Sequence, residues 1–329
     1  SPSSAFPLTV LARGTEGKYM RKYLRKLSMV GFAGLFLLSI SACGNSESSS
    51  ENSDVVSVDV FPVTVGDLTL DAQPVRVISL SPSATEMLYA IGAGSQVVAV
   101  DDYSNYPAEA AALGTALSGF EPNVEAIGGY SPDLVIIAYD PSNLVEQLNT
   151  LNIPVFVAGA ATSLESVYEQ IEQLGVLTGN SQAAIEVSKT LQTSIEDAVA
   201  AVKFSDPPLS YYYELDNTYY SVTSNTFVGQ IFNLFGMRNI ADNVESGNDY
   251  PQLSAEVIVS SDPDFIFLAD TKCCAQDATT VAARDGWGGL KAVTANQVVE
   301  LDDDVASRWG PRVLDLITAI RDAVAAANS

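Results

Sequence analysis

The sequence predicts an α/β protein of two three-layer α/β lobes, joined by a single long rigid α-helix, with a ligand cleft between the lobes. Short β-rich runs alternate with helical stretches in both halves of the chain, which is typical of largely parallel sheets covered by helices. Residues 181–202 separate the halves and contain no Gly or Pro. A similar phrase occurs once in each half, "VEAIGGYSPDLVIIA" at 124–138 and "AEVIVSSDPDFIFLA" at 255–269. This repeat favours two similar lobes, with chance similarity as the alternative.

The first half of the chain opens with an alternating segment, "VTVGDLTL" at 63–70, which predicts a small hairpin. After it, "SATEMLYAIG" predicts a helix that Ser83 and Glu86 open as a capping box and that Gly92 ends. The strands of this half are expected at 75–80, 96–100, 133–138 and 154–158.

The segment 181–202 carries apolar residues at helical spacing, which predicts one long amphipathic helix that "SDPP" at 205–208 ends. The α/β alternation then resumes, with β-rich runs at 209–215, 264–269 and 297–301, an apolar stretch at 226–236 and a last helix at 311–327. We therefore expect an N-terminal α/β lobe at 63–180, a linker helix at 181–204 and a C-terminal α/β lobe at 205–329.

The beginning of the chain predicts export. A basic stretch at 18–26 leads an apolar run from Met29 to Ile40, which is shorter than the roughly 30 Å of bilayer hydrocarbon requires. Small residues follow it and suit cleavage. We expect residues 1–42 to be a signal peptide with an over-extended N-terminus, whose true start is Met20.

The end of this segment, "ISAC", looks like the lipobox of bacterial lipoproteins. That resemblance implies that Cys43 is lipidated and becomes the first residue of the mature chain. A buried N-terminal helix with an incidental cysteine is the alternative. Residues 43–62 would then comprise the lipidated cysteine and a flexible Ser-rich tether.

The charge balance and the absence of histidine limit the function classes. The chain has 16 Lys and Arg against 40 Asp and Glu, a formal charge of −24, and no His. An acidic surface repels phosphates, so we expect no nucleic-acid partner. Solubility or adaptation to salt explains the acidity as readily as attraction of a cationic ligand or basic partner.

Without histidine, the chain lacks the usual ligands for zinc or manganese and any Ser-His or Cys-His nucleophile. It also contains no G-x-S-x-G elbow and no P-loop. We expect no metal site and no enzyme activity. A carboxylate pair of the glycosidase type and an adhesion or structural role stay open as alternatives from other classes.

Four segments together resemble the helical-backbone solute-binding proteins of ABC importers: "VRVISLSPSATEMLYAIG", "VVAVDDYSNYP", "NVEAIGGYSPDLVIIA" and "ASRWGPRVLDLI". The resemblance runs from Pro74 to about Ala327. Members of that family bind vitamin B12, ferric siderophores or haem. The segments "DYSNYP" and "YPQLSAE" are most similar to the vitamin B12 branch, although Tyr250 stands where that branch carries tryptophan and Phe120 occupies the neighbourhood on the other lobe.

The resemblance implies a monomeric receptor, lipid-anchored to the outer face of the cytoplasmic membrane, that delivers its ligand to an ABC permease dimer. The implied ligands are, in order, a cobalt corrinoid, a ferric siderophore and haem; no cofactor of the protein's own is expected. In the B12-binding relatives, glutamates that match Glu125 and Glu256 dock with arginines of the permease. Carboxylates that stabilise helix N-termini are the alternative for both residues.

Loops beyond the strand ends supply the candidate ligand-binding residues. Aromatic side chains suit a large planar ligand, and arginines suit a phosphate or carboxylate. The candidates are Tyr103, Tyr106, Phe120, Tyr139, Tyr213, Tyr250, Arg308, Trp309 and Arg312. A core position is the alternative for each tyrosine, and a salt bridge within one lobe is the alternative for each arginine.

Cys273 and Cys274 are adjacent in the loop after the second copy of the repeat. Vicinal cysteines can close an eight-membered disulfide ring, or they can remain as two buried thiols. A zinc site would need further Cys or His ligands, which the chain does not offer near them.

Overall fold

The computed structural model describes residues 59–115 and 117–328, which all belong to one compact unit, Val55–Ser329. The predicted signal peptide, the predicted lipidation site Cys43 and nearly all of the predicted tether therefore lie outside the described residues. No helix in the described part of the chain combines the length and the hydrophobicity needed to cross a bilayer.

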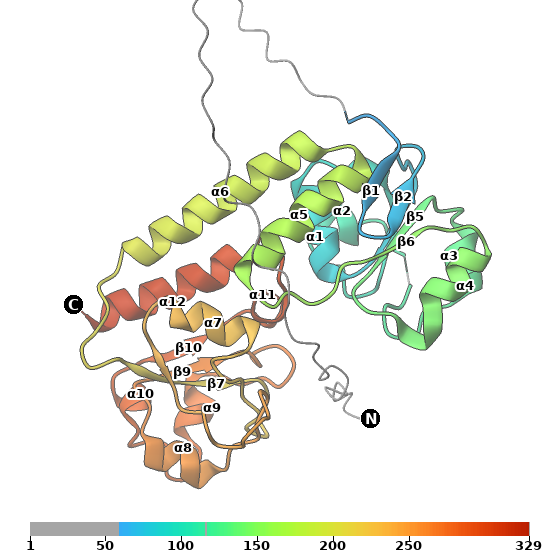
Figure 1. Ribbon diagram of the computed structural model, residues 1–329. Helices are drawn as coiled ribbons and strands as arrows, with labels where there is room; N and C mark the ends of the chain where they lie inside the picture. Colours follow the sequence, from blue (N-terminus) through green and yellow to red (C-terminus); the bar gives the residue numbers. More distant parts are fainter. Residues whose placement is uncertain (1–58, 116, 329) are drawn as a thin grey trace, which may run out of the picture. The chain divides into compact units, whose positions relative to one another are not determined.

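The N-terminal lobe is built on a parallel four-stranded sheet of order β4-β3-β5-β6. The antiparallel hairpin β1-β2 precedes this sheet in the chain (Figure 1). The strands of the lobe are β1 Val63–Val65, β2 Leu68–Leu70, β3 Val77–Leu80, β4 Val97–Val100, β5 Leu134–Ile137 and β6 Val155–Val157. Its helices are α1 Pro82–Ala90, η1 Gly94–Gln96, α2 Ala108–Ala111, α3 Val124–Gly129, η2 Pro141–Asn143, α4 Leu144–Thr150 and α5 Leu164–Thr178.

The C-terminal lobe repeats this plan with a parallel sheet of order β10-β9-β7-β8. Its strands are β7 Ser210–Glu214, β8 Arg238–Asn239, β9 Phe265–Leu268 and β10 Val298–Glu300. Its helices are α7 Phe227–Asn233, α8 Ala255–Ser261, α9 Ala278–Ala282, α10 Lys291–Thr294, α11 Asp303–Ser307 and α12 Val313–Ala327.

Both sheets are covered on both faces, which gives each lobe its three layers. In β3, Ile78 and Leu80 share a buried cluster with Ile127 of α3 and Leu148 of α4, whereas Val77 belongs to the cluster on the opposite face. The C-terminal sheet divides in the same way, because neighbouring residues of β7 and of β9 fall alternately into two different clusters. The period of two in a strand produces this division.

The long helix α6, Ser181–Ala200, contacts α5 of the N-terminal lobe and α12 of the C-terminal lobe (Figure 1). At 20 residues it is about 30 Å long. Leu191 and Ile195 are buried in a cluster that includes residues of both lobes. Gly175 of α5 lies against Ala184, where a side chain on the glycine would collide with the Ala184 Cβ. The connection is therefore a packed helix with a core that continues across it.

The start of α1 differs from the prediction. Ser81 is the N-cap, and its Oγ accepts the backbone N–H of Ala84 at 3.2 Å. The predicted capping box of Ser83 and Glu86 is wrong because both residues lie inside the helix and are buried. Glu86 is directed into a contact with the other lobe, which the local sequence pattern does not reveal.

Candidate functional site

Three large rings form an open aromatic surface at the carboxyl edge of the N-terminal sheet, which we call the aromatic wall (Tyr103, Phe120, Tyr139). The ring centroids of Tyr103 and Phe120 are 5.5 Å apart with the planes perpendicular, and those of Phe120 and Tyr139 are 6.4 Å apart. Their exposed fractions are 52%, 43% and 43%. Aromatic rings that contact one another yet remain this exposed are typical of a surface that a ligand covers.

The backbone around the wall is held by short polar contacts. Asp101, buried after β4, accepts the hydroxyl of Ser104 at 2.5 Å, and burial raises the pKa of this carboxyl. Ser118 Oγ accepts the backbone N–H of Phe120 at 3.2 Å. A Cβ on Gly119 would lie 2.8 Å from the Leu80 carbonyl oxygen, so the chain can pass this close to the end of β3 only as glycine. These contacts fix the backbone that carries the rings of the aromatic wall.

The two arginines of the "RWGPR" segment bind a glutamate of the opposite lobe. Arg308 Nη1 lies 2.8 Å from Glu86 Oε1, and Arg312 donates from Nη2 at 2.6 Å and from Nε at 3.0 Å to the same carboxylate. The Glu86 and Arg308 side chains are 1% and 7% exposed. The two arginines and Glu86 form what we call the inter-lobe ion cluster. In this structure both arginines are engaged there, Arg308 buried and Arg312 with 18% of its side chain exposed.

The same cluster fixes the neighbouring candidates. Arg312 also lies over the ring of Tyr106 at 4.1 Å, and Arg308 Nη2 donates to the Tyr103 carbonyl oxygen at 2.9 Å. Trp309 donates its indole N–H to Gln170 of α5 at 3.2 Å. Tyr106 and Trp309 therefore belong to the junction between the lobes, and the ion cluster positions one residue of the aromatic wall through its backbone.

Candidates of the C-terminal lobe separate into an exposed and a buried residue. Tyr250 is 37% exposed in the loop before α8, with Tyr220 at 38% on an adjoining bridge. Tyr213 of β7 is fully buried, packs against Phe232 and donates its hydroxyl to the Ala306 carbonyl at 3.3 Å. The prediction that Tyr213 contacts a ligand is wrong, since its place in a doubly covered strand makes it a core residue.

A buried acidic group beneath the C-terminal edge was not predicted. Arg284 binds Glu214 through two bonds of 2.7 and 2.6 Å and lies 4.6 Å from the centroid of Trp287. Asp270 is also fully buried, and its carboxyl oxygens have no hydrogen-bond partner among the described residues. Burial, followed by the charge of Glu214, raises the pKa of Asp270 to about 8. The only signal in the sequence is an acid directly after an apolar strand.

The predicted docking residues occupy equivalent places in the two lobes. Glu125 lies in the first turn of α3, which Asn123 caps, and Glu256 lies in the first turn of α8, which Ser254 caps. Both side chains are exposed, and neither has an ion pair within the described residues. Hydrogen bonds at the helix start lower the pKa of Glu256, so it carries a negative charge at neutral pH.

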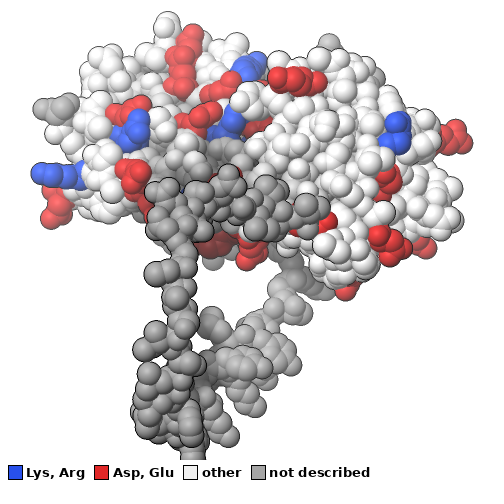
Figure 2. Space-filling model, turned by 90° about the horizontal axis from the view of Figure 1, so that it is seen from above, with Lys and Arg blue, Asp and Glu red and all other residues white. Residues whose placement is uncertain are grey.

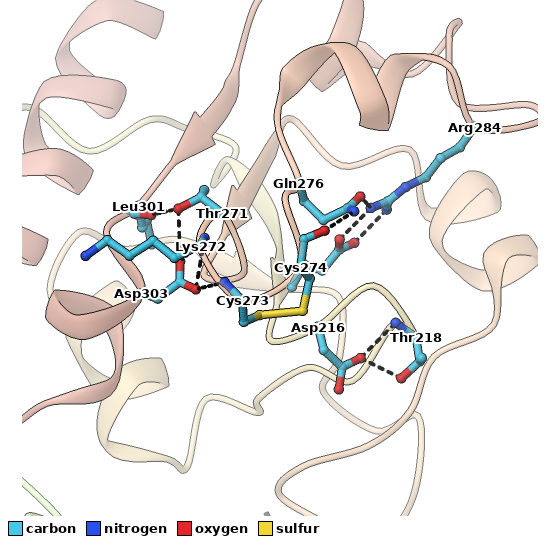
Figure 3. Close-up of a disulfide and its surroundings, with 11 residues drawn as sticks. Asp216, Thr218, Thr271, Lys272, Cys273, Cys274, Gln276, Arg284, Leu301 and Asp303 are labelled. Carbon is cyan, nitrogen blue, oxygen red and sulfur yellow. Dashed lines mark hydrogen bonds and ion pairs between the residues drawn. A yellow bond between two sulfur atoms is a disulfide. The ribbon is translucent and has the colours of Figure 1, made fainter. Parts of the chain in front are cut away.

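Cys273 and Cys274 form a disulfide in the loop after β9 (Figure 3). Cys273 is exposed and Cys274 is half-buried. Of the two states that the sequence left open, the structure contains the ring. Within the described residues there is no group of three or more acidic or cysteine side chains that could hold a metal ion.

Comparison with known proteins places this geometry in a family. A model of the periplasmic binding protein family matches residues 77–305. The cobalamin-binding protein of Halobacterium salinarum is 32% identical over 287 residues, covering 83% of this chain and 77% of its own. An uncharacterized ABC transporter substrate-binding lipoprotein of Bacillus subtilis is 29% identical over 309 residues, covering 89% and 96%.

Solved structures of periplasmic binding proteins are also similar to this chain. The periplasmic vitamin B12 binding protein of Vibrio cholerae superimposes with a TM-score of 0.66 at 27% identity, covering 78% of this chain and 98% of its own. A periplasmic heme-binding protein from Roseiflexus gives a TM-score of 0.67 at 22% identity, which shows a shared fold. The chain belongs to the periplasmic binding protein family, and the resemblance to ABC-importer solute-binding proteins is confirmed.

Proposed function

We propose that this protein is a receptor that captures a corrinoid outside the cytoplasm and delivers it to the permease of an ABC importer. The observation that carries the proposal is the aromatic wall, because three exposed, mutually contacting rings suit one face of a large, partly apolar macrocycle. The cobalamin-binding relative and the vitamin B12-binding structure support the same ligand class.

The charges near the wall favour a corrinoid over the other two ligand classes. Arg308 and Arg312 are paired with Glu86, so they do not offer a free cation to haem propionates or to the carboxylates of a siderophore. Figure 2 shows acidic side chains spread over the face that it presents, with scattered basic ones among them. The chain as a whole carries a formal charge of −24, so a ligand rich in neutral amides meets less repulsion from it than an anionic ligand does. Ferric siderophores and then haem remain second and third in our order.

Titration of the full chain with cyanocobalamin, cobinamide, a ferric siderophore and haem tests this proposal. We expect a corrinoid dissociation constant below about 1 µM, with weaker binding of the two anionic iron ligands. Tighter binding of haem or of the siderophore would show that the ligand is not a corrinoid, and the receptor function would still hold. Absence of binding by all four, in protein whose folding is verified by circular dichroism, would contradict the receptor function with these ligand classes.

The proposed partner is a two-fold symmetric permease that meets Glu125 on one lobe and Glu256 on the other. Equivalent exposed carboxylates on two similar lobes suit two equivalent basic sites. The chain would act as a monomer, tethered through Cys43 to the outer face of the cytoplasmic membrane, and it would bind its ligand without chemical turnover. The lipoprotein relative supports the anchor.

A further inference from the structure

The disulfide loop, residues 269–277, joins the carboxyl end of β9 to α9. Carboxyl ends of parallel strands are where ligands bind in open α/β sheets, so this loop lies on the functional edge of the C-terminal lobe. Cys273 is exposed there. The ring is therefore accessible both to a ligand and to a reagent in solution.

One side of the loop is fastened by the carboxylate of Asp303 in α11. It accepts the Thr271 hydroxyl at 2.9 Å, the Lys272 N–H at 3.0 Å and the Cys273 N–H at 2.8 Å (Figure 3). These bonds to a charged acceptor are of the stronger kind. The bonds to Lys272 and Cys273 require the N–H groups of two consecutive residues to point toward the same carboxylate. The disulfide ring, which begins at Cys273, restricts the backbone in this conformation.

The other side of the loop folds back on itself. The Asp270 carbonyl accepts the N–H groups of Cys274 and Gln276, each at 3.3 Å, and the Gln276 side chain donates to the Cys274 carbonyl at 2.8 Å. Ala275, directly after the ring, has a φ of +52°. A non-glycine residue adopts this conformation only when its surroundings impose it. The disulfide is the covalent part of those surroundings.

The loop is also connected to the aromatic wall on the other lobe. Lys272 Nζ lies 3.1 Å from Asp304 Oδ2, which accepts the side-chain N–H of Asn105 at 3.0 Å. Asp304 is paired with Arg308 at 3.2 Å, and Arg308 donates to the Tyr103 carbonyl. The start of α11 thus contacts both the disulfide loop and the loop that carries Tyr103.

We propose that the Cys273–Cys274 disulfide is a reducible element of the ligand-binding surface: the oxidised ring holds the disulfide loop in its binding conformation, and reduction weakens ligand capture. This inference rests on the proposed function for the place of the ligand. The reductant is a dithiol, either a small molecule or a protein with paired cysteines.

The reaction is a thiol–disulfide exchange. A thiolate of the dithiol attacks one sulfur of the ring, the S–S bond breaks, and a mixed disulfide forms. The second thiol of the reductant displaces the protein sulfur. Cys273 and Cys274 gain two electrons and two protons and become thiols, while the dithiol leaves as a disulfide. Without the ring, the backbone of both cysteines regains rotational freedom and Ala275 can leave its left-handed conformation.

The test compares the full chain before and after reduction with dithiothreitol, with peptide mapping to confirm that Cys273 and Cys274 are alkylated only in the reduced sample. Cyanocobalamin is the probe. We expect reduction to raise its dissociation constant about tenfold or more, comparable to the loss of one or two hydrogen bonds. The matched control is the Cys273→Ala/Cys274→Ala variant, which keeps Cys43 and should bind weakly with or without dithiothreitol.

Hydrogen exchange provides a readout that does not need a ligand. The backbone N–H groups of Lys272 and Cys273 should exchange at least about tenfold faster in the reduced protein, because opening of the Asp303 bonds becomes easier. Failure of all four ligands to bind would end the corrinoid proposal, and unchanged exchange would then end the inference as well. Equal cyanocobalamin affinity in the confirmed oxidised and reduced states overturns the inference while leaving the receptor function intact.

Discussion

In the N-terminal lobe the repeated unit of α3 and β5 runs into Tyr139, and in the C-terminal lobe the equivalent unit of α8 and β9 runs into Asp270. The two positions are matched by the same alignment that matches Glu125 with Glu256. Tyr139 is 43% exposed in the aromatic wall, whereas Asp270 is completely buried. The same unit of structure thus ends in an open apolar surface on one lobe and in a covered acid on the other.

The aspartate of the repeated Pro-Asp makes equivalent hydrogen bonds in the two lobes. Asp133 accepts the N–H groups of Val75 and Arg76, each at 2.9 Å, just before β3. Asp264 accepts the N–H of Ser210 at 2.8 Å at the start of β7. Each aspartate accepts backbone N–H groups at or just before the start of the neighbouring strand. The repeated aspartate of the sequence is therefore explained by its bonds to the neighbouring strand, and the lobes differ where their strands end.

Because of this difference, we expect the carboxyl edges of the two lobes to contribute differently to ligand binding. The N-terminal edge exposes three rings, while the C-terminal edge carries the disulfide loop, whose Gln276 accepts a hydrogen bond from Arg284, the partner of the buried Glu214. The inter-lobe ion cluster joins the two edges. Each of the following changes addresses one shared or one divergent feature of the lobes, beginning with the largest expected effect.

Reversal of both matched glutamates, Glu125→Arg with Glu256→Arg, should abolish uptake, because each lobe would present a positive charge to the basic permease site that we propose for it. Ligand affinity should stay at the wild-type value, since neither residue belongs to the aromatic wall. Radiolabelled cyanocobalamin uptake and titration of the purified chain measure the two quantities. Normal uptake by the double variant would reduce both residues to helix-stabilising carboxylates, and each single reversal shows whether the lobes contribute equally.

Removal of the central carboxylate by Glu86→Ala should lower the free energy of unfolding by about 3–5 kcal/mol, because two buried or half-buried arginines lose their partner. Urea denaturation measures this loss. Asp322→Asn is the matched control, since its pair with Arg321 is on the surface, with side chains 63% and 32% exposed, and is worth less than about 1 kcal/mol. Equal effects of the two variants would show that the ion cluster contributes little to joining the lobes.

Much of the architecture could be predicted from the sequence because it follows from periodicity. The long helix at 181–200, the strands formed by the short apolar runs and the repeated unit were all visible as patterns. The ion cluster was not visible. Glu86 and Arg308 lie 222 residues apart, so local spacing cannot pair them, and Glu86 also matched the pattern of a capping box.

The candidate site also contains residues that the local sequence located correctly and one that it did not. Exposed aromatics after strands, such as Tyr103 and Tyr139, are found where the loop positions predicted them. Tyr213 is not, because it lies within β7 and its side chain points to a buried face. Whether the aromatic wall binds a ligand stays a prediction.

The buried acid of the C-terminal lobe should make stability depend on pH in a direction opposite to that of an ion-paired aspartate. The pKa of Asp270 is about 8 in the folded protein against an ordinary value of 3.8, so the folded state holds a proton that the unfolded state releases. Its contribution to stability is complete below about pH 4 and is lost as the pH rises to about 8. The slope approaches about 1.4 kcal/mol per pH unit inside this window.

Asp270→Asn removes that titration. Urea denaturation between pH 5 and pH 8.5 should show a flatter dependence in this variant than in the wild type, whereas Asp322→Asn, an exposed control, should keep the wild-type slope. Identical slopes in the wild type and Asp270→Asn would mean that Asp270 is ionised in the folded protein and that a rearranged neighbour satisfies it.

The smallest change concerns the open side of the comparison. Phe120→Ala removes the central ring of the aromatic wall, and we expect it to raise the dissociation constant of cyanocobalamin about tenfold, close to 1.4 kcal/mol, because a truncated anchor loses its packing on the ligand. Stability should change little, since the ring is already 43% exposed. Phe204→Ala is the matched control: that ring is 56% exposed and lies against Gly236 before β8, away from the carboxyl edges. If both variants bind the corrinoid like the wild type, the N-terminal lobe does not supply the ligand face, and the search for it moves to Tyr220 and Tyr250 on the C-terminal lobe.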